Sequence, residues 1–337
     1  MSGFESSRSG ILLLDKPQGI TSHDVVSRTR RAVGTRKVGH AGTLDPMATG
    51  LLVLGVNSST RLLTYLVGLD KQYLATIRLG AATDTDDAEG QVTEIADPET
   101  VDALIPQDLE IAVGQLTGVI QQVPSTVSAI KVDGKRAYAR AREGEAVELS
   151  ARTVTVSSFE ILEVEHTAEH GPDGPRQYWD VQVRIDCSSG TYIRALARDV
   201  GRALGVGGHL TSLRRTRVGP FEVDQASALD DLRVSALRSP ASVATTLFPS
   251  LALDPQQAVD LEHGKKIDTP ELAAQATAGY SGPVAAIAPD GRLVGLVEPI
   301  GNQARVLVNF PVDPGTADKG NGSPTAKPDA VERAEPE

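Results

Sequence analysis

Gly39-His-Ala-Gly-Thr-Leu-Asp-Pro-Met-Ala-Thr-Gly50 is the stretch of sequence that constrains the chain most. Its glycines and its proline restrict the backbone, and His40 and Asp45 are its only titratable residues. A helical apolar pattern precedes this loop, and the apolar run 51–54 behind it predicts a buried strand. A loop between two such elements can hold a carboxylate in a fixed position. Single loop carboxylates more often form an Asx turn, here before Pro46, so the motif alone leaves a structural role open.

Outward from this loop, strand and helix patterns alternate without a regular strand-helix-strand repeat. Thr21 and Asp24 have capping-box spacing, which predicts the start of the preceding helix. A further helix is predicted at 191–204, and strands are predicted at 11–14, 73–79, 153–164 and 178–186. This irregular mixture predicts an α+β fold.

The chain changes character near Phe248. A short helix is predicted at 254–263, followed by three strands near Val284, Val294 and Val306, which together outline a small β-rich module. From Asp313 onward the sequence is rich in Pro, Gly, Ala and charge, with almost no bulky apolar side chains. That composition predicts a disordered tail.

Composition restricts the class of protein. With 337 residues, 40% of them hydrophobic, the chain can bury a substantial core and is long enough for two domains. A single cysteine, Cys187, excludes an internal disulfide framework and a cysteine-rich zinc site, and it suits a reducing, cytoplasmic compartment. The apolar run at 11–14 is far too short to span a membrane.

Charge is unevenly distributed along the chain. The net charge of −11 argues against a nucleic-acid partner, but no Lys or Arg occurs between Leu79 and Ile130, where acidic residues crowd together. The cations gather in three clusters elsewhere: Arg28, Arg30, Arg31, Arg36 and Lys37; Lys131, Lys135, Arg136, Arg140 and Arg142; and Arg194, Arg198, Arg202, Arg214, Arg215 and Arg217. Such segregation predicts a basic face opposite an acidic back, although each cluster could equally be a solvated helix face.

Two further stretches contain candidate site residues. Tyr192 and Arg194 lie at the start of the predicted helix at 191–204, where an arginine can pair with a carboxylate or simply face solvent. In Lys71-Gln-Tyr73, the aromatic ring opens a predicted strand and can stack on a base or pack in the core. The residues alone leave both pairs of alternatives open.

The loop at 39–50 resembles the catalytic motif of TruB-type pseudouridine synthases. Other motifs of that family occur in the expected order, so the resemblance covers roughly residues 10–220 and is far more specific than a single pattern. These motifs are Leu14-Asp-Lys-Pro-Gln-Gly19, Lys71-Gln-Tyr73, Leu79-Gly80 with the acidic stretch 83–90, Gln122-Val-Pro124 with 128–131, Gly190-Thr-Tyr-Ile-Arg194 and 209–215.

The resemblance implies a fold and an activity. The fold is a catalytic core with a mixed, mainly antiparallel sheet at 10–247, with an RNA-clamping insertion at about 124–152, followed by a PUA-like domain at 248–312 and the tail at 313–337. The activity is isomerisation of uridine 55 in the T-arm of tRNA by a monomer that needs no small-molecule cofactor and no metal. The target base must be flipped out of its loop to react.

The resemblance also implies roles for individual residues. Asp45 is the expected nucleophile, Arg194 holds it ionised, and Tyr73 stacks on the target base. His40, Tyr192 and Leu213 match substrate-contacting positions. The residues expected to bind RNA are Lys16, Lys131, Lys135, Arg136, Arg214 and Arg215.

Two other classes of function are compatible with parts of the sequence. A non-catalytic tRNA-binding or tRNA-folding protein would use the same basic face, with Asp45 and Arg194 incidental. A metal-dependent hydrolase would use His23, Asp24, His40 and the carboxylates at 84–87 as ligands, but their spacing matches no specific metal motif. Replacing Asp45 by Asn separates an enzyme from a binder, because only the enzyme would lose turnover.

Overall fold

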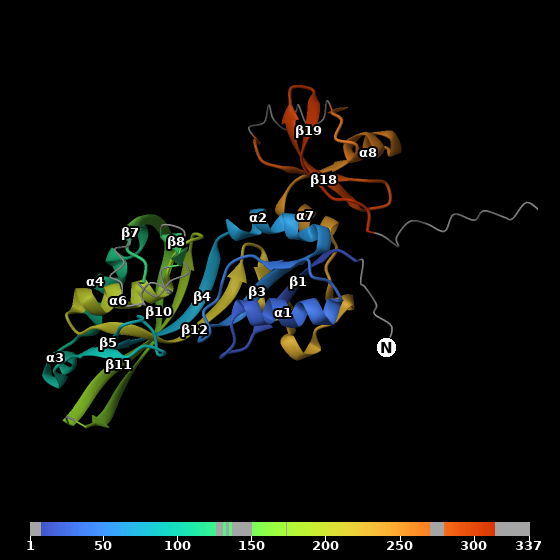
Figure 1. Cartoon of the computed structure of the whole chain (residues 1–337). Coiled ribbons are helices and arrows are strands. Elements are labelled where there is room, and N and C mark those ends of the chain that lie inside the picture. The colour runs from blue at the N-terminus through green and yellow to red at the C-terminus, as the bar shows by residue number, and fades with distance from the viewer. Residues whose placement is uncertain are drawn as a thin grey trace, which may run out of the picture.

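The computed structural model describes residues 8–125, 131–132, 135–136, 150–172, 174–269 and 280–313 (Figure 1). Most of the predicted insertion and the tail beyond Asp313 lie outside these residues. Within the described part of the chain, no helix is long and apolar enough to cross a membrane.

The first part of the chain, up to Leu247, contains one large sheet, two separate two-stranded sheets and several helices. Its strands are β1 (Gly10–Lys16), β2 (Val38–His40), β3 (Thr49–Val56), β4 (Lys71–Leu79), β5 (Ala81–Thr83), β6 (Val92–Ile95), β7 (Gly118–Gln122), β8 (Lys131–Val132), β9 (Lys135–Arg136), β10 (Arg152–Gly171), β11 (Gly174–Cys187), β12 (Gly208–Val218), β13 (Phe221–Glu222) and β14 (Ser227–Ala228). Its α-helices are α1 (Ser22–Val33), α2 (Leu63–Val67), α3 (Pro98–Asp102), α4 (Pro106–Gln115), α6 (Ile193–Leu204) and α7 (Pro240–Leu247). Its 3-10 helices are η1 (Asn57–Leu62), η2 (Val223–Gln225), η3 (Leu229–Asp231) and η4 (Val234–Ala236).

Ten strands form one mixed sheet. Their main order is β14-β1-β3-β12-β4-β11-β10-β7, with β2 paired to β3 and β13 paired to β12. Only the pairs β1 with β14 and β3 with β12 are parallel, and every other pair described in this sheet is antiparallel. The prediction of an α+β fold with a mainly antiparallel sheet is therefore confirmed.

Strand β1 is buried on both faces, and alternate residues contact different layers. Leu12 and Leu14 pack with the apolar side of α1, whereas Ile11 and Leu13 pack with α2 and α7. Helix α1 begins with the predicted capping box, in which the Thr21 and Asp24 side chains each accept from the backbone N–H of the other residue. The loop at 41–48 follows this helix after β2.

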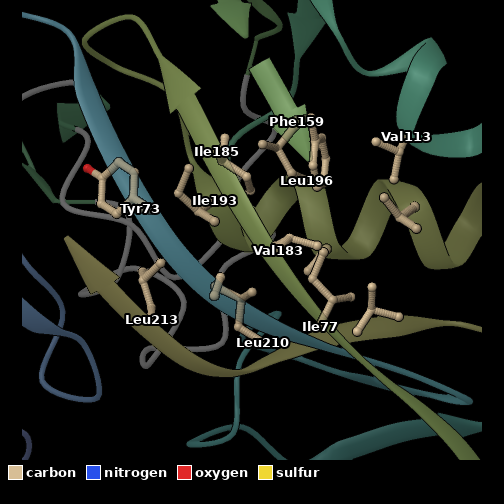
Figure 2. Close-up of a cluster of buried hydrophobic side chains, with 14 of the residues drawn as sticks. Tyr73, Ile77, Val113, Phe159, Val183, Ile185, Ile193, Leu196, Leu210 and Leu213 are labelled. Carbon is tan, nitrogen blue, oxygen red and sulfur yellow. The ribbon is translucent and has the colours of Figure 1, made fainter. Parts of the chain in front are cut away.

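A second apolar core lies between the other half of the sheet and helices α4 and α6 (Figures 1 and 2). The predicted stripe of α6 is buried there through Ile193, Leu196 and Val200. Figure 2 shows Tyr73 and Leu213 toward one end of this cluster, on β4 and β12. The end of the core therefore forms part of the site described below.

The hairpin of β10 and β11 is longer than predicted. The sequence predicts strands at 153–164 and 178–186, yet the two strands pair from Val156 with Cys187 out to Gly171 with Gly174. The outer half carries many exposed polar side chains, so it lacks the apolar alternation that identified the inner half. The ring of His166 stacks on Trp179 there, with centroids 4.6 Å apart.

The C-terminal module is β-rich, as predicted. It contains β15 (Ser250–Ala252), α8 (Pro255–Glu262), β16 (Ile267–Asp268), β17 (Val284–Ile287), β18 (Leu293–Ile300) and β19 (Gln303–Asn309), and its sheet order is β15-β17-β18-β19-β16. Figure 1 shows the module above α2 and α7. Leu62, Leu63 and Leu66 share an apolar cluster with Leu296 and Phe310, so the module packs on η1 and α2.

Candidate active site

A cavity of about 310 Å³ opens where three segments meet: the loop at 42–45, the start of β4, and the residues that lead into α6. Asp45, Tyr73 and Arg194, the three predicted catalytic residues, all line it, and so do Tyr192 and Leu213. These residues are up to 168 positions apart in the sequence, from Asp45 to Leu213. The structure therefore gathers these five predicted site residues, together with Arg215, around one cavity.

Hydrogen bonds from buried side chains hold the loop that carries Asp45. The Ser22 hydroxyl, at the start of α1, donates to the Leu44 carbonyl at 3.0 Å and accepts from the Leu44 N–H at 2.9 Å. The Lys16 ammonium donates to the carbonyls of Pro46, Ile20 and Pro17. Residues on both sides of Asp45 are thus anchored, which limits how far its carboxylate can move.

Arg215 supports the same loop from below. Its side chain is 1% exposed, and its guanidinium donates to the carbonyls of Leu51 at 2.7 Å and Gly42 at 3.1 Å. The backbone of β12 approaches so closely that a Cβ on Gly50 would lie 2.2 Å from the Arg215 carbonyl oxygen. Because Gly50 also has a φ of +100°, only glycine fits at the end of the motif.

Arg194 joins two carboxylates. Its Nε lies 3.1 Å from Asp45 Oδ2, and its Nη1 lies 3.1 Å from Asp87 Oδ2 and donates to the Thr85 carbonyl at 3.0 Å. The Arg194 side chain is 5% exposed and that of Asp87 is 4% exposed, whereas that of Asp45 is 38% exposed toward the cavity. Asp87 therefore anchors the guanidinium in the interior, and the guanidinium orients the carboxylate that faces the cavity.

Opposing effects act on the pKa of Asp45. Burial raises this pKa, the Arg194 guanidinium lowers it, Asp87 raises it and Lys16 lowers it, and the balance is a raised pKa. The prediction that Arg194 favours the ionised form gives the right direction for that interaction. Desolvation nevertheless outweighs the arginine, and a carboxylate with weakened solvation is a more reactive base or nucleophile.

The aromatic and basic groups in the cavity are perturbed as well. Burial raises the pKa of the Tyr73 phenol, so its hydroxyl stays neutral. Burial lowers the pKa of Lys71 to about 8, and its ammonium donates to the carbonyls of Val67 and Leu69 at the end of α2. The Val67 carbonyl also accepts from the Ser189 hydroxyl at 2.7 Å, which closes this wall.

Several predicted contact residues lie elsewhere. His40 is half-buried on β2 outside the cavity lining, with its ring edge-on to His23, and burial lowers the pKa of His40. Arg214 forms a bidentate ion pair with Asp15 at 3.0 and 2.7 Å. Lys131, Lys135 and Arg136 lie on β8 and β9, whose side chains are outside the described part of the structure.

The RNA-binding roles predicted for Lys16 and Arg215 stay predictions. Lys16 is completely buried and Arg215 is 1% exposed, and both donate to backbone carbonyls. Arg215 also lines the cavity. These residues support the loop with Asp45, and the sequence offered no sign of their burial because Lys and Arg are rarely buried.

Sequence reasoning also missed Asp87. The stretch 83–90 is part of the resemblance, but its acidic residues are predicted only to form an acidic back or, in the alternative function, to bind a metal. Asp86 and Asp87 are instead 8% and 3% exposed, and they pair with Arg198 and Arg194. The available signal was the coincidence of a carboxylate-rich motif with two arginines spaced one helical turn apart on α6.

A separate basic cleft lies between the end of α1, η1 and the segment after β19. It has a volume of about 1270 Å³ and is lined by Arg30, Arg31, Arg36, Lys37 and Arg61, with Asp313 at one side. Within the described residues, none of these five cations forms an ion pair with a carboxylate. The N-terminal basic cluster therefore includes exposed charge that is available to an anionic partner. We call this site the basic cleft.

Comparison with known protein families defines the class. The family profile described as TruB family pseudouridylate synthase, N-terminal domain, matches residues 30–193. Residues 194–251 match the tRNA pseudouridylate synthase B C-terminal domain, and residues 248–311 match the C-terminal profile of tRNA pseudouridine synthase II. The cavity at Asp45 thus belongs to an enzyme of the pseudouridine synthase class.

Similar proteins show to which family of pseudouridine synthases the chain belongs. The chain is 57% identical over 310 residues to the tRNA pseudouridine synthase B of Leifsonia xyli subsp. xyli, covering 90% of this chain and 97% of the relative. It is 52% identical to the protein of the same name from Paenarthrobacter aurescens, covering 91% and 96%. The chain belongs to the TruB family of pseudouridine synthases.

Solved structures share the fold at lower identity. The crystal structure of a Cbf5-Nop10-Gar1 complex contains a chain that is 24% identical, with a TM-score of 0.63, and the match covers 92% of this chain and 87% of that one. A chain of an H/ACA RNP bound to a substrate RNA containing 2'-deoxyuridine matches with 23% identity and the same TM-score, covering 90% and 86%. The combination of the large sheet with the C-terminal module therefore occurs in these solved structures as well.

Proposed function

We propose that this enzyme converts uridine 55 in the T-loop of tRNA to pseudouridine, with Asp45 as the nucleophile. Its relatives from two actinobacteria bear the name tRNA pseudouridine synthase B, which supports tRNA as the substrate. The observation that carries the assignment of Asp45 is its contact with Arg194, 3.1 Å away, at the wall of the cavity. A tRNA substrate also places the enzyme in the cytoplasm.

The reaction conserves atoms and electrons. The bond between N1 of uracil and C1' of ribose breaks, a bond between C5 and C1' forms, and the proton on C5 is replaced by one on N1. Asp45 must be ionised to attack the ribose or the uracil ring, and Arg194 orients it during that step. The isomerisation needs no net oxidant or reductant, so we assign it to the residues around the cavity.

The cavity is suited to a flipped base. Turning the target uridine out of a folded loop costs a few kcal/mol. Stacking on an aromatic ring returns about 1–3 kcal/mol per base, and Tyr73 and Tyr192 both face the cavity. Leu213 adds an apolar contact from β12, so the flipped base meets aromatic and aliphatic walls beside the Asp45 carboxylate.

The rest of the tRNA needs a cationic surface. The basic cleft supplies five exposed cations, and Lys131, Lys135 and Arg136 on the insertion add three more. We assign the T-arm as the part recognised, by its shape and its backbone, because phosphate contacts position RNA without reading its sequence. The enzyme acts as a monomer, with a catalytic domain at 10–247, a PUA-like domain at 248–312 and a tail from 313.

Tritium release tests this proposal. A tRNA transcript labelled at C5 of uridine should lose tritium to water with the wild-type protein, whereas Asp45→Asn should be slower by more than about a thousandfold, as expected when a nucleophile is removed. The variant should still bind tRNA, because Asn keeps the shape of the side chain. A wild-type protein that binds tRNA without releasing tritium would instead be a non-catalytic binder, and an active Asp45→Asn would exclude Asp45 as nucleophile.

A further inference from the structure

The acidic loop between β5 and β6 contacts two consecutive turns of α6. The Thr85 carbonyl and the Asp87 carboxylate both face Arg194, at 3.0 and 3.1 Å. The carboxylate of Asp86, between them, faces the other way and lies 3.3 Å from Nη1 of Arg198. Arg194 and Arg198 are four residues apart, so they lie on the same side of the helix.

Asp86 has an unusual backbone conformation. Its φ is +59°, in the left-handed region that non-glycine residues seldom adopt and that Asp and Asn tolerate best. The residue is 8% exposed, and its N–H donates to the Thr83 carbonyl at 3.3 Å while its carbonyl accepts from the Leu210 N–H at 3.0 Å. This turn is what points Asp86 toward Arg198 and its two neighbours toward Arg194.

Arg198 connects three elements. Besides Asp86, its guanidinium contacts the Asp199 carboxylate at 2.9 Å and donates to the Val123 carbonyl, just after β7, at 2.8 Å. The Ser125 hydroxyl donates to the Thr85 carbonyl at 3.1 Å, so the segment after β7 also supports the acidic loop. The Arg198 and Asp86 side chains are only 20% and 11% exposed, which strengthens their attraction relative to a surface pair.

We propose that Arg198 and Asp86 are positioning residues for the isomerisation, because their ion pair fixes the loop that presents Thr85 and Asp87 to Arg194. Neither residue lines the cavity, so both act through Arg194 on Asp45. The proposal rests on the function assigned to Asp45 above. It extends that assignment to two residues, away from the reacting base, that set the geometry of the catalytic pair.

Loss of the ion pair between Arg198 and Asp86 should change the pH dependence of the rate, whereas loss of folded protein lowers the rate equally at every pH. If the acidic loop shifts, Arg194 is less firmly held beside Asp45, while the burial of Asp45 stays the same. The other charged groups that act on Asp45 are Asp87 and Lys16, with Glu89 nearby, and they remain. The acid limb of the reaction rate, which follows ionisation of Asp45 in the complex, should then move to higher pH.

The experiment compares Asp86→Asn, Arg198→Gln and the double variant with the wild type. Asn tolerates the left-handed backbone, so Asp86→Asn removes the charge with little strain. Single-turnover tritium release with excess enzyme is measured from acid to neutral pH. We expect each single variant to be slower by about tenfold near pH 6, with its acid limb moved upward, and the double variant to be no slower than the slower single variant, because contacting residues are not additive.

Arg202→Gln is the matched control. Arg202 is an exposed arginine one turn further along α6, and its variant should keep the wild-type rate and acid limb. The proposal is overturned if Arg198→Gln behaves like Arg202→Gln, if its rate falls equally at every pH, or if the two single effects multiply. Should Arg198→Gln fail to fold, Asp86→Asn carries the test alone.

The controls separate this proposal from the proposed function. If the wild type releases no tritium, or if Asp45→Asn is active, the function proposed for Asp45 itself is rejected. A normal wild type and an inactive Asp45→Asn, together with unaltered Asp86→Asn and Arg198→Gln, reject only the positioning role.

Discussion

Two groups of cations in this molecule are put to opposite uses. Beneath the loop of Asp45, the buried side chains of Lys16, Lys71 and Arg215 donate to backbone carbonyls. In the basic cleft, Arg31 and Arg36 are exposed and, among the described residues, have no carboxylate partner. The first group shapes the protein, whereas the second is available to a ligand.

The difference shows that burial, rather than residue type, decides what a cation does. A buried cation must satisfy its donors within the protein, and a loop rich in carbonyls provides the acceptors. An exposed cation keeps its solvation until an anion arrives, and it contributes little to folding stability. Substitutions in the two groups should therefore change different measurements.

The largest effect is expected for Arg215→Met. The change removes charge-assisted hydrogen bonds to Leu51 and Gly42 and leaves two carbonyls unsatisfied, which should lower the free energy of unfolding by about 3–5 kcal/mol. Urea denaturation measures this loss. An Arg215→Met protein as stable as the wild type would show that the buried group is not a scaffold.

A smaller loss is expected for Lys16→Met. Met fills much of the same volume, and the cost of desolvating an ammonium disappears, so the net loss should be about 1–3 kcal/mol. Tritium release should also slow, because the carbonyl of Pro46, next to Asp45, loses its donor. A stability loss with an unchanged rate would separate the scaffold from the catalytic loop.

In the basic cleft, Arg31→Gln with Arg36→Gln should change stability by less than about 0.5 kcal/mol. Binding of tRNA should weaken, and the slope of log affinity against log salt should fall by about one for each phosphate that the cleft no longer neutralises. Filter binding at several salt concentrations measures both quantities. Arg233→Gln, an exposed arginine elsewhere, serves as the control, and equal effects of the two changes would remove the cleft from the RNA surface.

The last effect is a dependence of stability on pH. Burial lowers the pKa of Lys16 to about 8 in the folded protein, from 10.5 in the unfolded chain. The folded state therefore binds fewer protons between these values, so this residue makes stability rise as pH increases from about 8 to 10.5. The stability difference between wild type and Lys16→Met should grow across that window, and a constant difference would contradict the perturbed lysine.

The sequence predicts the parts of this molecule that follow local rules. The capping box at Thr21, the apolar stripe of α6 and the glycine-bounded loop around Asp45 are all patterns within a few residues, and the structure contains each of them. The pairing of Arg194 with Asp87 and the burial of Lys16 depend on interactions between distant segments. A local pattern can suggest that a carboxylate and an arginine pair, but it does not specify which distant segments meet. A buried lysine and a surface lysine therefore look alike in one sequence.

The short segment of η1 and α2 contacts both the C-terminal module and the wall of the cavity. Leu62 and Leu66 pack beneath Phe310 of the C-terminal module, while the Val67 carbonyl, at the far end, fixes Lys71 and Ser189 in the cavity wall. Removing the C-terminal module would expose Leu62 and Leu66 to solvent. It would also loosen the wall of the cavity that the Val67 carbonyl supports. A shortened enzyme designed as a minimal catalyst would therefore need new apolar cover for α2 before its cavity could keep its form.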